Sequence, residues 1–316
     1  MSPLVWWWAQ ADPSFRETYN GFVWEEPGER GKSSKGRLAH PTLSPKGEGK
    51  RMVIGNASLM PCPGSRYRWV ICNVVVREEY RRQGIARRLM EETISEARRQ
   101  GAEEAVLQVY RDNLPAMRLY TDLGFQPLSG EMGLRLTAAG PVDVLDAPGY
   151  ELRHCQPGSL TEGSFRDGQA AYRLASLAIP AAQQWLKPVR AGEYEVDWLT
   201  HLGERLADLA AGRRRYRLMA FKGDEPAALV GVEAALRRGA HSLKLLIHPK
   251  HRGKLEPMLV SRALAMLAEL PGREVEATVM TDDTAAIQAL GSYGFREKRT
   301  LLTMSYRLTG KDRDHE

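Results

Sequence analysis

One stretch, residues 73–90, constrains the fold of this chain more than any other. A β-branched run at 74–76 stops at a charged turn, and an amphipathic helix begins just after Gly84. Apolar residues recur at helical spacing from Ile85 to Ala97, and Gly101 supplies a helix stop signal. The sequence therefore predicts a strand, a short loop and a helix that follow one another directly.

The loop is suited to binding an anion. The first N–H groups of a helix have no intrahelical partner and lie at the positive end of the helix dipole. Gly84 has no side chain and Ala86 has almost none, so phosphate oxygens can approach the backbone closely. Positive charge is supplied by Arg81, Arg82, Arg87 and Arg88. The predicted ligand is a diphosphate, and the alternative is a plain packing turn.

A second strand and a second helix follow. Residues 105–110 read as a strand, and Asn113 is placed to cap a short helix whose apolar residues share one face. Gly124 closes that helix, and Phe125 comes next. The predicted order is strand, anion loop, helix, strand and Asn-capped helix.

In these two segments the chain resembles the GNAT superfamily of acyl-CoA N-acyltransferases. The family's pyrophosphate loop reads Arg/Gln-x-x-Gly-x-Gly/Ala, which residues 81–86 fit. Its second signature is an Asn followed by Ala-x-x-Leu-Tyr-x-x-x-Gly-Phe, which Asn113 and residues 116–125 fit. The resemblance implies a mixed α/β fold, with a central and mostly antiparallel sheet flanked by helices.

The resemblance also implies a cosubstrate, acetyl-CoA, and a direct attack on its thioester by an acceptor amine. The pantetheine arm would lie along residues 74–76 as an extra strand, where backbone amides could polarise the thioester carbonyl. Asn113 would hold pantetheine. The predicted cofactor-binding residues are Val74, Val75, Val76, Arg81, Arg82, Gln83, Gly84, Ile85, Ala86, Arg87 and Asn113.

Tyr120 would be the catalytic acid that protonates the departing CoA thiolate, as the same resemblance implies. Its helical spacing with Ala116 and Leu123 by itself favours a core aromatic residue instead. A general base is harder to assign, because the strand that ends at residue 76 carries no carboxylate. Glu78 and Glu79 read as a solvated turn, and we expect ordered water to remove the amine proton.

A length of 316 residues and a hydrophobic content of 43% predict two domains with ordinary cores. We expect a GNAT acetyltransferase domain at 1–140, a linker at 141–149 and a degenerate GNAT-like domain at 150–316. In the first domain, residues 21–26, 52–60 and 67–76 would be the family's second, third and fourth strands. The Gly-, Pro- and Ser-rich stretch 27–50 would be a long hairpin loop, and closing strands would lie within 126–137.

The first domain has too few residues before Gly21 for the family's first strand and helices. Either the chain start is truncated or the domain is abbreviated. The second domain, its linker or a second copy of the chain would then cover the exposed sheet edge and shape the acceptor pocket. Trp6, Trp7 and Trp8 would either pack in the core or line that junction.

The second half repeats the first, but its loop is altered where cofactor binding needs it intact. When Arg252 is aligned with Arg81, Leu255 takes the place of Gly84 and Pro257 takes the place of Ala86. A leucine side chain would fill phosphate space, and proline removes an N–H donor. Further along, Asp283 aligns with Asn113, and Leu290 aligns with Tyr120. The second domain is therefore predicted to be non-catalytic.

Composition narrows the remaining possibilities. Cys62, Cys72 and Cys155 lack metal-ligand spacing, and His248 with His251 reads as a solvated turn, so we expect reduced thiols and no metal. The sequence shows neither a transmembrane run nor a signal peptide, which predicts a cytoplasmic protein without membrane partners.

A net charge of +6 and a pI of about 9.2 admit nucleic acid as a partner. The densest basic run, residues 213–215, is interpreted as a solvated helix end that leads into a strand. Two alternatives to the enzyme remain, a catalytically silent acyl-CoA-binding or scaffold protein and, supported by charge alone, a nucleic-acid-binding protein. A homodimer is possible.

Overall fold

The computed structural model describes residues 20–25, 37–39, 52–62, 64–155, 162–179, 184–185, 188–194 and 198–308. The chain divides into two compact units. The first unit comprises residues 1–129 and 302–316, and the second comprises residues 130–301. The predictions for Trp6, Trp7 and Trp8 fall outside the described residues.

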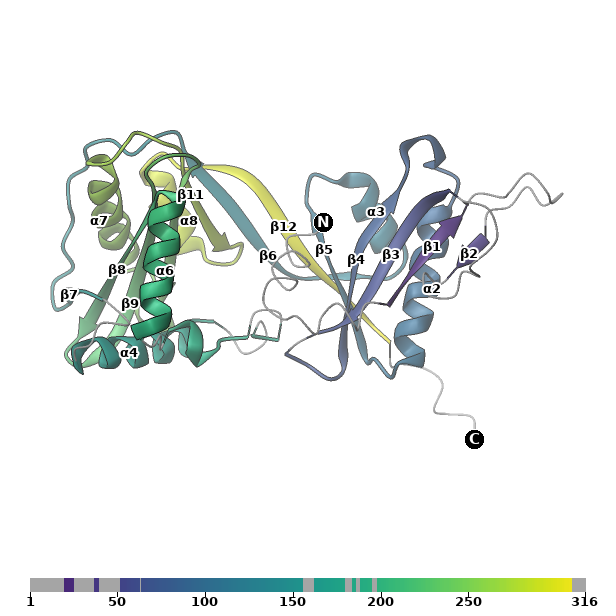
Figure 1. The fold of residues 1–316 in the computed structure, drawn as a ribbon, viewed down its shortest axis with the longest axis horizontal. Helices are drawn as coiled ribbons and strands as arrows, with labels where there is room; N and C mark the ends of the chain where they lie inside the picture. Colours follow the sequence, from purple (N-terminus) through teal and green to yellow (C-terminus); the bar gives the residue numbers. More distant parts are fainter. Residues whose placement is uncertain are drawn as a thin grey trace. The chain divides into compact units, whose positions relative to one another are not determined.

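The first unit is built on a mixed sheet (Figure 1), whose strands follow the order β2-β1-β3-β4-β5-β12. β4 and β5 are parallel, while β1 is antiparallel to β2 and β3, and β3 is antiparallel to β4. The described elements contributed by its first segment are β1 (Asn20–Glu25), β2 (Arg37–Ala39), β3 (Val53–Pro61), β4 (Arg68–Val76), η2 (Glu78–Tyr80), α2 (Ile85–Arg99), β5 (Glu104–Tyr110) and α3 (Leu114–Asp122).

The two helices of the described part of the first unit, α2 and α3, pack on one face of this sheet. The apolar stripe of α2 buries Met90 and Ile94 against Ile71 of β4 and Leu107 of β5. Tyr120 and the residues around it bring α3 onto the same cluster. The alternation of side chains along a strand therefore divides β4 and β5 into a helix-covered face and an opposite face.

Two long strands contribute to both halves of the chain. β6 (Gln126–Leu136) passes into the second unit at Gly130, where it pairs antiparallel with β11. β12 (Arg296–Arg307) begins in the second unit, but from Leu302 onward it belongs to the first, where it follows β5 in the sheet order. Met304 and Leu308 complete the core around Tyr120. The division of the chain thus differs from the expected cut at residue 140.

From β9 onward, the second unit repeats the order of elements that the first shows from β3 onward. Its sheet runs β7-β8-β9-β10-β11-β6-β12, and β10 and β11 are its parallel pair. One face packs on α7 and α8, and α4 packs on the other. Its described elements are β7 (Glu151–His154), α4 (Glu162–Ala178), η3 (Ala191–Glu193), α6 (Trp198–Ala211), β8 (Arg213–Lys222), β9 (Glu225–Ala235), β10 (His241–Ile247), η4 (Pro249–His251), α7 (Glu256–Ala268), β11 (Val275–Met280) and α8 (Thr284–Ser292).

Several segments differ from the sequence-based expectation. The stretch predicted as a hairpin loop contains the short edge strand β2, and the closing strands expected within 126–137 form one continuous strand, β6. The segment expected to be a linker packs on the second unit, since the Leu145 backbone N–H donates to Ser261 Oγ at 3.0 Å and Asp146 pairs with Arg262. Apolar burial and these two contacts tie it to α7.

Candidate functional site

The loop between β4 and α2 has a tightly curved backbone. Gly84 is the N-cap of α2 with φ of 76°, and Arg82 is also left-handed with φ of 63°. A Cβ added at Gly84 would meet no other atom within 4 Å, so the backbone conformation, and not crowding, calls for glycine here. A side chain at this position would project into the open space in front of the helix.

The N-terminus of α2 has no side-chain cap. The Arg88 N–H donates to the Gly84 carbonyl at 3.1 Å and closes the first helical turn. The N–H groups of Ile85, Ala86 and Arg87 precede that turn and have no intrahelical acceptor. Such a terminus favours an anion, both by hydrogen bonding and through the helix dipole.

The four arginines of the loop are placed differently from one another. Arg87 forms an ion pair with Asp122 at 3.1 Å, Arg81 Nε donates to the Val76 carbonyl at 3.2 Å, and Arg88 stacks over Trp24. Arg82 is exposed in the curved part of the loop. Three of the four arginines predicted to supply positive charge are thus held by contacts with other residues, although Arg81 and Arg88 are exposed like Arg82. Gln83 is also exposed.

The pairing between β4 and β5 ends before this loop, and we call the unpaired stretch of β4 the slot. The recorded parallel pairs run from Arg68 with Glu104 to Ile71 with Leu107 and stop there. Val75 and Val76 pair with Asn56 and Gly55 of β3, while the pairing of β4 with β5 does not extend to residues 74–76. Val75 is 56% exposed. This unpaired strand edge can accept an extended ligand as an additional strand.

A bulge in β4 lies where the two strands separate. The register with β3 shifts between Asn56 and Ser58, and Asn73 adopts a positive φ of 52°. The side chain of Asn56 stabilises this backbone because its Nδ2 donates to the Asn73 carbonyl at 3.0 Å. The sequence reasoning missed this contact, and an asparagine inside a β-rich run was the available signal.

Asn113 caps α3, as predicted, with Oδ1 accepting from the Ala116 N–H at 3.4 Å. Tyr120 lies in the core cluster of the first unit, 6% exposed and 6.1 Å from the Phe125 ring centroid. Burial raises the pKa of Tyr120 to about 12, so the phenol holds its proton at neutral pH. This placement is the one that helical spacing alone favours.

The corresponding loop of the second unit carries its own anion. Glu256 lies in the first turn of α7 and is completely buried. Its carboxylate accepts from the Gly253 N–H at 2.8 Å and from the Leu255 N–H at 3.1 Å. Leu255 is also fully buried, and Pro257 offers no N–H. The Glu256 carboxyl group therefore binds N–H groups of the loop that precedes α7, in the place where a phosphate would bind.

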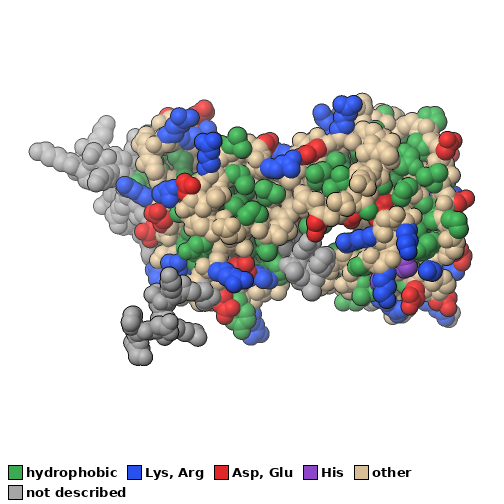
Figure 2. Space-filling view, turned by 180° about the vertical axis from the view of Figure 1, so that it is seen from behind, with side chains coloured by type: hydrophobic (Ala, Val, Ile, Leu, Met, Phe, Trp, Pro, Cys, Tyr) green, Lys and Arg blue, Asp and Glu red, His purple; other side chains and the backbone are tan. Residues whose placement is uncertain are grey.

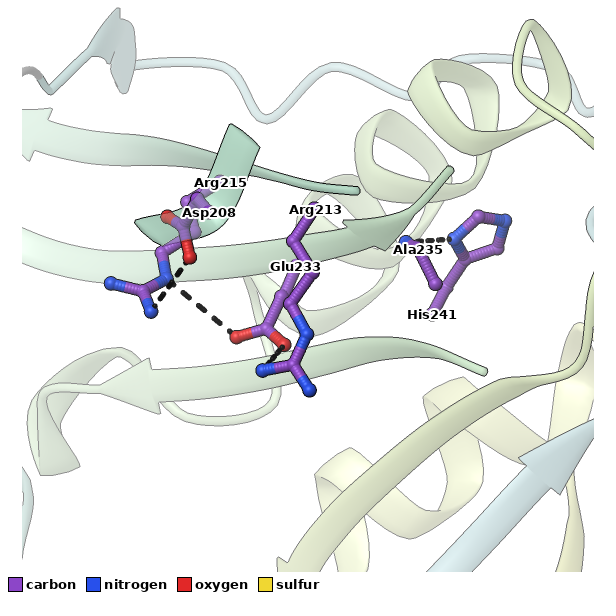
Figure 3. A network of polar contacts seen from close by, with 6 residues as sticks. All are labelled: Asp208, Arg213, Arg215, Glu233, Ala235 and His241. Atoms are coloured by element: carbon purple, nitrogen blue, oxygen red, sulfur yellow. Dashed lines mark hydrogen bonds and ion pairs between the residues drawn. The ribbon is translucent and has the colours of Figure 1, made fainter. Parts of the chain in front are cut away.

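The basic run 213–215 lies inside β8, so the helix-end interpretation was wrong. Arg213 and Arg215 extend the antiparallel pairing with β9, and both contact Glu233, at 3.3 and 3.6 Å (Figure 3). Arg215 also pairs with Asp208 at 3.1 Å. On the face shown in Figure 2, Lys and Arg side chains are interspersed with Asp and Glu. This distribution differs from the continuous basic stripe typical of nucleic-acid binding.

The two histidines of the second unit's turn are only partly solvated. Tyr150 Oη and His251 Nδ1 are 3.0 Å apart, and burial lowers the pKa of His251. His241, nearby in sequence, is buried, with Nδ1 accepting from the Ala235 N–H (Figure 3). Among the described residues, no group of three potential ligands could hold a metal ion, and no helix there is long and apolar enough to cross a membrane.

Comparison with known proteins agrees with this geometry. Residues 4–125 match the model of the acetyltransferase (GNAT) family. The matched region contains the β4–α2 loop and ends just after α3. Among curated proteins, the chain is 39% identical over 59 residues to the uncharacterised N-acetyltransferase YobR of Bacillus subtilis and 39% identical over 62 residues to N-alpha-acetyltransferase 30 of Schizosaccharomyces pombe.

These curated matches are short. They cover 19% and 20% of the present chain and 24% and 41% of the two relatives, so the chain spans less than half the length of either.

Solved structures show that the GNAT fold extends over most of the chain. A GCN5-related N-acetyltransferase from Sphaerobacter thermophilus aligns over 90% of this chain and 84% of its own length, with a TM-score of 0.58 and 16% identity. A tandem GNAT protein from the clavulanic acid biosynthesis pathway aligns over 84% of this chain and 82% of its own, with a TM-score of 0.50 and 19% identity. The mixed α/β fold predicted from sequence is confirmed.

Proposed function

We propose that the first unit transfers the acetyl group of acetyl-CoA to a primary amine. The observation that carries this proposal is the juxtaposition, within one strand-loop-helix segment, of an uncapped helix N-terminus at Gly84 and an unpaired edge on β4. The first fits a diphosphate, and the second fits the amide-containing pantetheine arm. The GNAT family match over residues 4–125 and the two N-acetyltransferase relatives support this reading.

In the proposed reaction, the amine nitrogen attacks the thioester carbonyl carbon and the C–S bond then breaks. Backbone N–H groups near the β4 bulge stabilise the negative charge that develops on the carbonyl oxygen. As the C–S bond breaks, the Tyr120 hydroxyl donates a hydrogen bond to the CoA sulfur, a proton from solvent neutralises the thiolate, and the amine loses its proton to water. Asn113 and the residues from Val74 to Ala86 bind the cosubstrate.

Tyr120 is suited to this role in one respect and constrained in another. A phenol with a pKa of about 12 is protonated at neutral pH, as an acid must be. A thiol has an ordinary pKa of about 8.5, so complete transfer from Tyr120 is uphill by roughly 3.5 pKa units. Tyr120 therefore acts mainly by hydrogen bonding to the sulfur as charge develops, and solvent completes the protonation.

The deep burial of Tyr120 favours one competing function, a protein that binds acyl-CoA without turnover. Measuring CoA release from acetyl-CoA over a panel of primary amines, with mass spectrometry of the products, separates the two. The proposal predicts an acetylated amine formed in equal amount to released CoA. Tight acetyl-CoA binding without product for any amine would favour the silent protein, and the absence of acetyl-CoA binding would refute both.

A further inference from the structure

The sheet of the first unit has polar side chains on the face opposite α2 and α3. Leu107 and Val109 of β5 pack into the core with those helices. Gln108 lies between them on the strand, so its side chain is directed to the opposite face. The same alternation on β12 places Met304 in the core and Thr303 on the opposite face. Among the described residues of this unit, no helix packs on that face.

Gln108 and Thr303 belong to a row of four residues that crosses the sheet where the pairing between β4 and β5 ends. The row consists of Ser58, Cys72, Gln108 and Thr303. Ser58 of β3 pairs with Cys72 of β4. Cys72 directly follows Ile71, whose pairing with Leu107 is the last between β4 and β5, and Gln108 directly follows Leu107. Gln108 in turn contacts Thr303 of β12. The row therefore crosses four strands at the closed end of the slot.

One polar atom in this row lacks a partner. Gln108 Nε2 donates to Thr303 Oγ1 at 3.4 Å, while Gln108 Oε1 is buried and has no hydrogen-bond partner within the described part of the chain. A carboxamide flipped by 180° would exchange the two atoms and still leave one end unsatisfied. A buried and unpaired amide group lowers stability, so its presence calls for an explanation.

We propose that Gln108, held by Thr303, binds the acceptor amine. This inference rests on the proposed function and adds a specificity-determining residue to it. The acetyl end of a pantetheine arm that enters along Val74 to Val76 reaches the closed end of the slot. α2 and α3 cover one face there, and Gln108 Oε1 is directed to the other face, where Ser58, Cys72 and Thr303 are buried. An amine bound on that side would donate an N–H to this otherwise buried and unpaired oxygen.

The cysteine in the same row does not compete for this role. Burial raises the pKa of the Cys72 thiol to about 12, and its Sγ lies 3.6 Å from the Met60 sulfur. The thiol therefore stays protonated at neutral pH and is directed toward an apolar neighbour. Gln108 is left as the group in the row with an unused acceptor.

The test compares Gln108→Leu with wild type in the full chain, using the best amine found in the panel. The proposal predicts a KM for that amine raised roughly 10- to 100-fold, the loss expected for one hydrogen bond to a charged or polar donor. The Kd for acetyl-CoA is expected to stay within about twofold. Gln100→Leu, at the exposed C-terminal end of α2, is the control and leaves both constants unchanged.

A readout that needs no acceptor is the melting temperature. Gln108→Leu replaces a carboxamide that has a buried, unpaired oxygen with an apolar side chain of similar size. It should raise the melting temperature by about a few degrees, because an unsatisfied polar group is removed. Thr303→Val removes the hydroxyl group that accepts from Gln108 Nε2, so it raises the amine KM by a smaller factor than Gln108→Leu does.

Three outcomes overturn the inference. An unchanged amine KM removes Gln108 from the acceptor site, a loss confined to acetyl-CoA affinity assigns it to pantetheine, and a lower melting temperature for Gln108→Leu means that the carboxamide is satisfied. Failure of wild type to acetylate any amine would instead refute the proposed function on which the inference rests.

Discussion

Replacing Glu256 with Ala tests whether the second unit's loop is filled by its own carboxylate. The substitution leaves the N–H groups of Gly253, which is exposed, and Leu255, which is buried, without this acceptor. Each unsatisfied buried donor costs about 1–3 kcal/mol, and a favourable charge at a helix N-terminus adds roughly 0.3–1 kcal/mol. Water can satisfy the exposed Gly253 N–H, so only the Leu255 donor is left unsatisfied and we expect a loss of about 1–4 kcal/mol.

For a unit of this size, each kcal/mol shifts the melting temperature by about 2–4 °C, so Glu256→Ala should lower the melting temperature by roughly 2–15 °C. Differential scanning calorimetry at neutral pH measures the shift. Glu269→Ala is the matched control, because Glu269 lies at the exposed C-terminal end of the same helix, and it should change stability by less than about 0.5 kcal/mol.

Glu256→Gln keeps one acceptor oxygen and should fall between wild type and Glu256→Ala. A Glu256→Ala variant that melts with wild type would refute the reasoning. The alanine variant should also gain no affinity for acetyl-CoA, since Leu255 and Pro257 remain in place.

Two further predictions concern the first unit. Tyr120→Phe should lower turnover by ~100-fold to ~10,000-fold with little change in acetyl-CoA affinity. Because the Tyr120 pKa is about 12, this loss of turnover should be uniform from about pH 6 to pH 10. Tyr306→Phe in the same core is the control, and a Tyr120→Phe rate equal to that of wild type would make Tyr120 a core residue only. Two truncations, a chain that ends at residue 301 and a fragment of residues 1–140, remove Met304 and Leu308 from the core and uncover β5. Either truncated protein should lose acetyl-CoA binding or be insoluble, and a soluble, fully active fragment would contradict this.

Local signals predicted the elements of this fold well, and for identifiable reasons. The apolar period from Ile85, the glycines at either end of α2 and the asparagine before α3 each specify a backbone state that neighbouring residues decide. The structure reproduces those elements nearly residue by residue. The degenerate loop of the second half was also visible in the sequence, as Leu255 and Pro257.

Long-range pairing was less accessible. Nothing local in residues 296–307 indicates that the strand begins in one unit and ends in the other, because period-2 alternation specifies a face and not a partner. The arginines at 213–215 were misplaced for a related reason. Their charges suggested a solvated helix end, but the partners that make them stable in a strand, Glu233 and Asp208, come from other elements.

The residues of the candidate site also differ in whether their roles depend on local or on long-range contacts. Gly84 and Asn113 act through their own backbone neighbourhood and were found from the sequence. Glu256 and Gln108 were missed, since the role of each depends on what its buried side chain meets, or fails to meet, in three dimensions.

The central claim, one acetyl-CoA site located at the β4–α2 loop, is tested most directly by isothermal titration calorimetry with acetyl-CoA on wild type, Gly84→Leu and Gly101→Leu. Gly84 and Gly101 flank the two ends of α2 with nearly equal φ of 76° and 77°, and an added Cβ meets nothing within 4 Å at either, so the two variants carry a similar backbone strain. We expect one site per chain in wild type, lost in Gly84→Leu and retained in Gly101→Leu. Two sites in wild type, or one tight site that survives in Gly84→Leu, would contradict it.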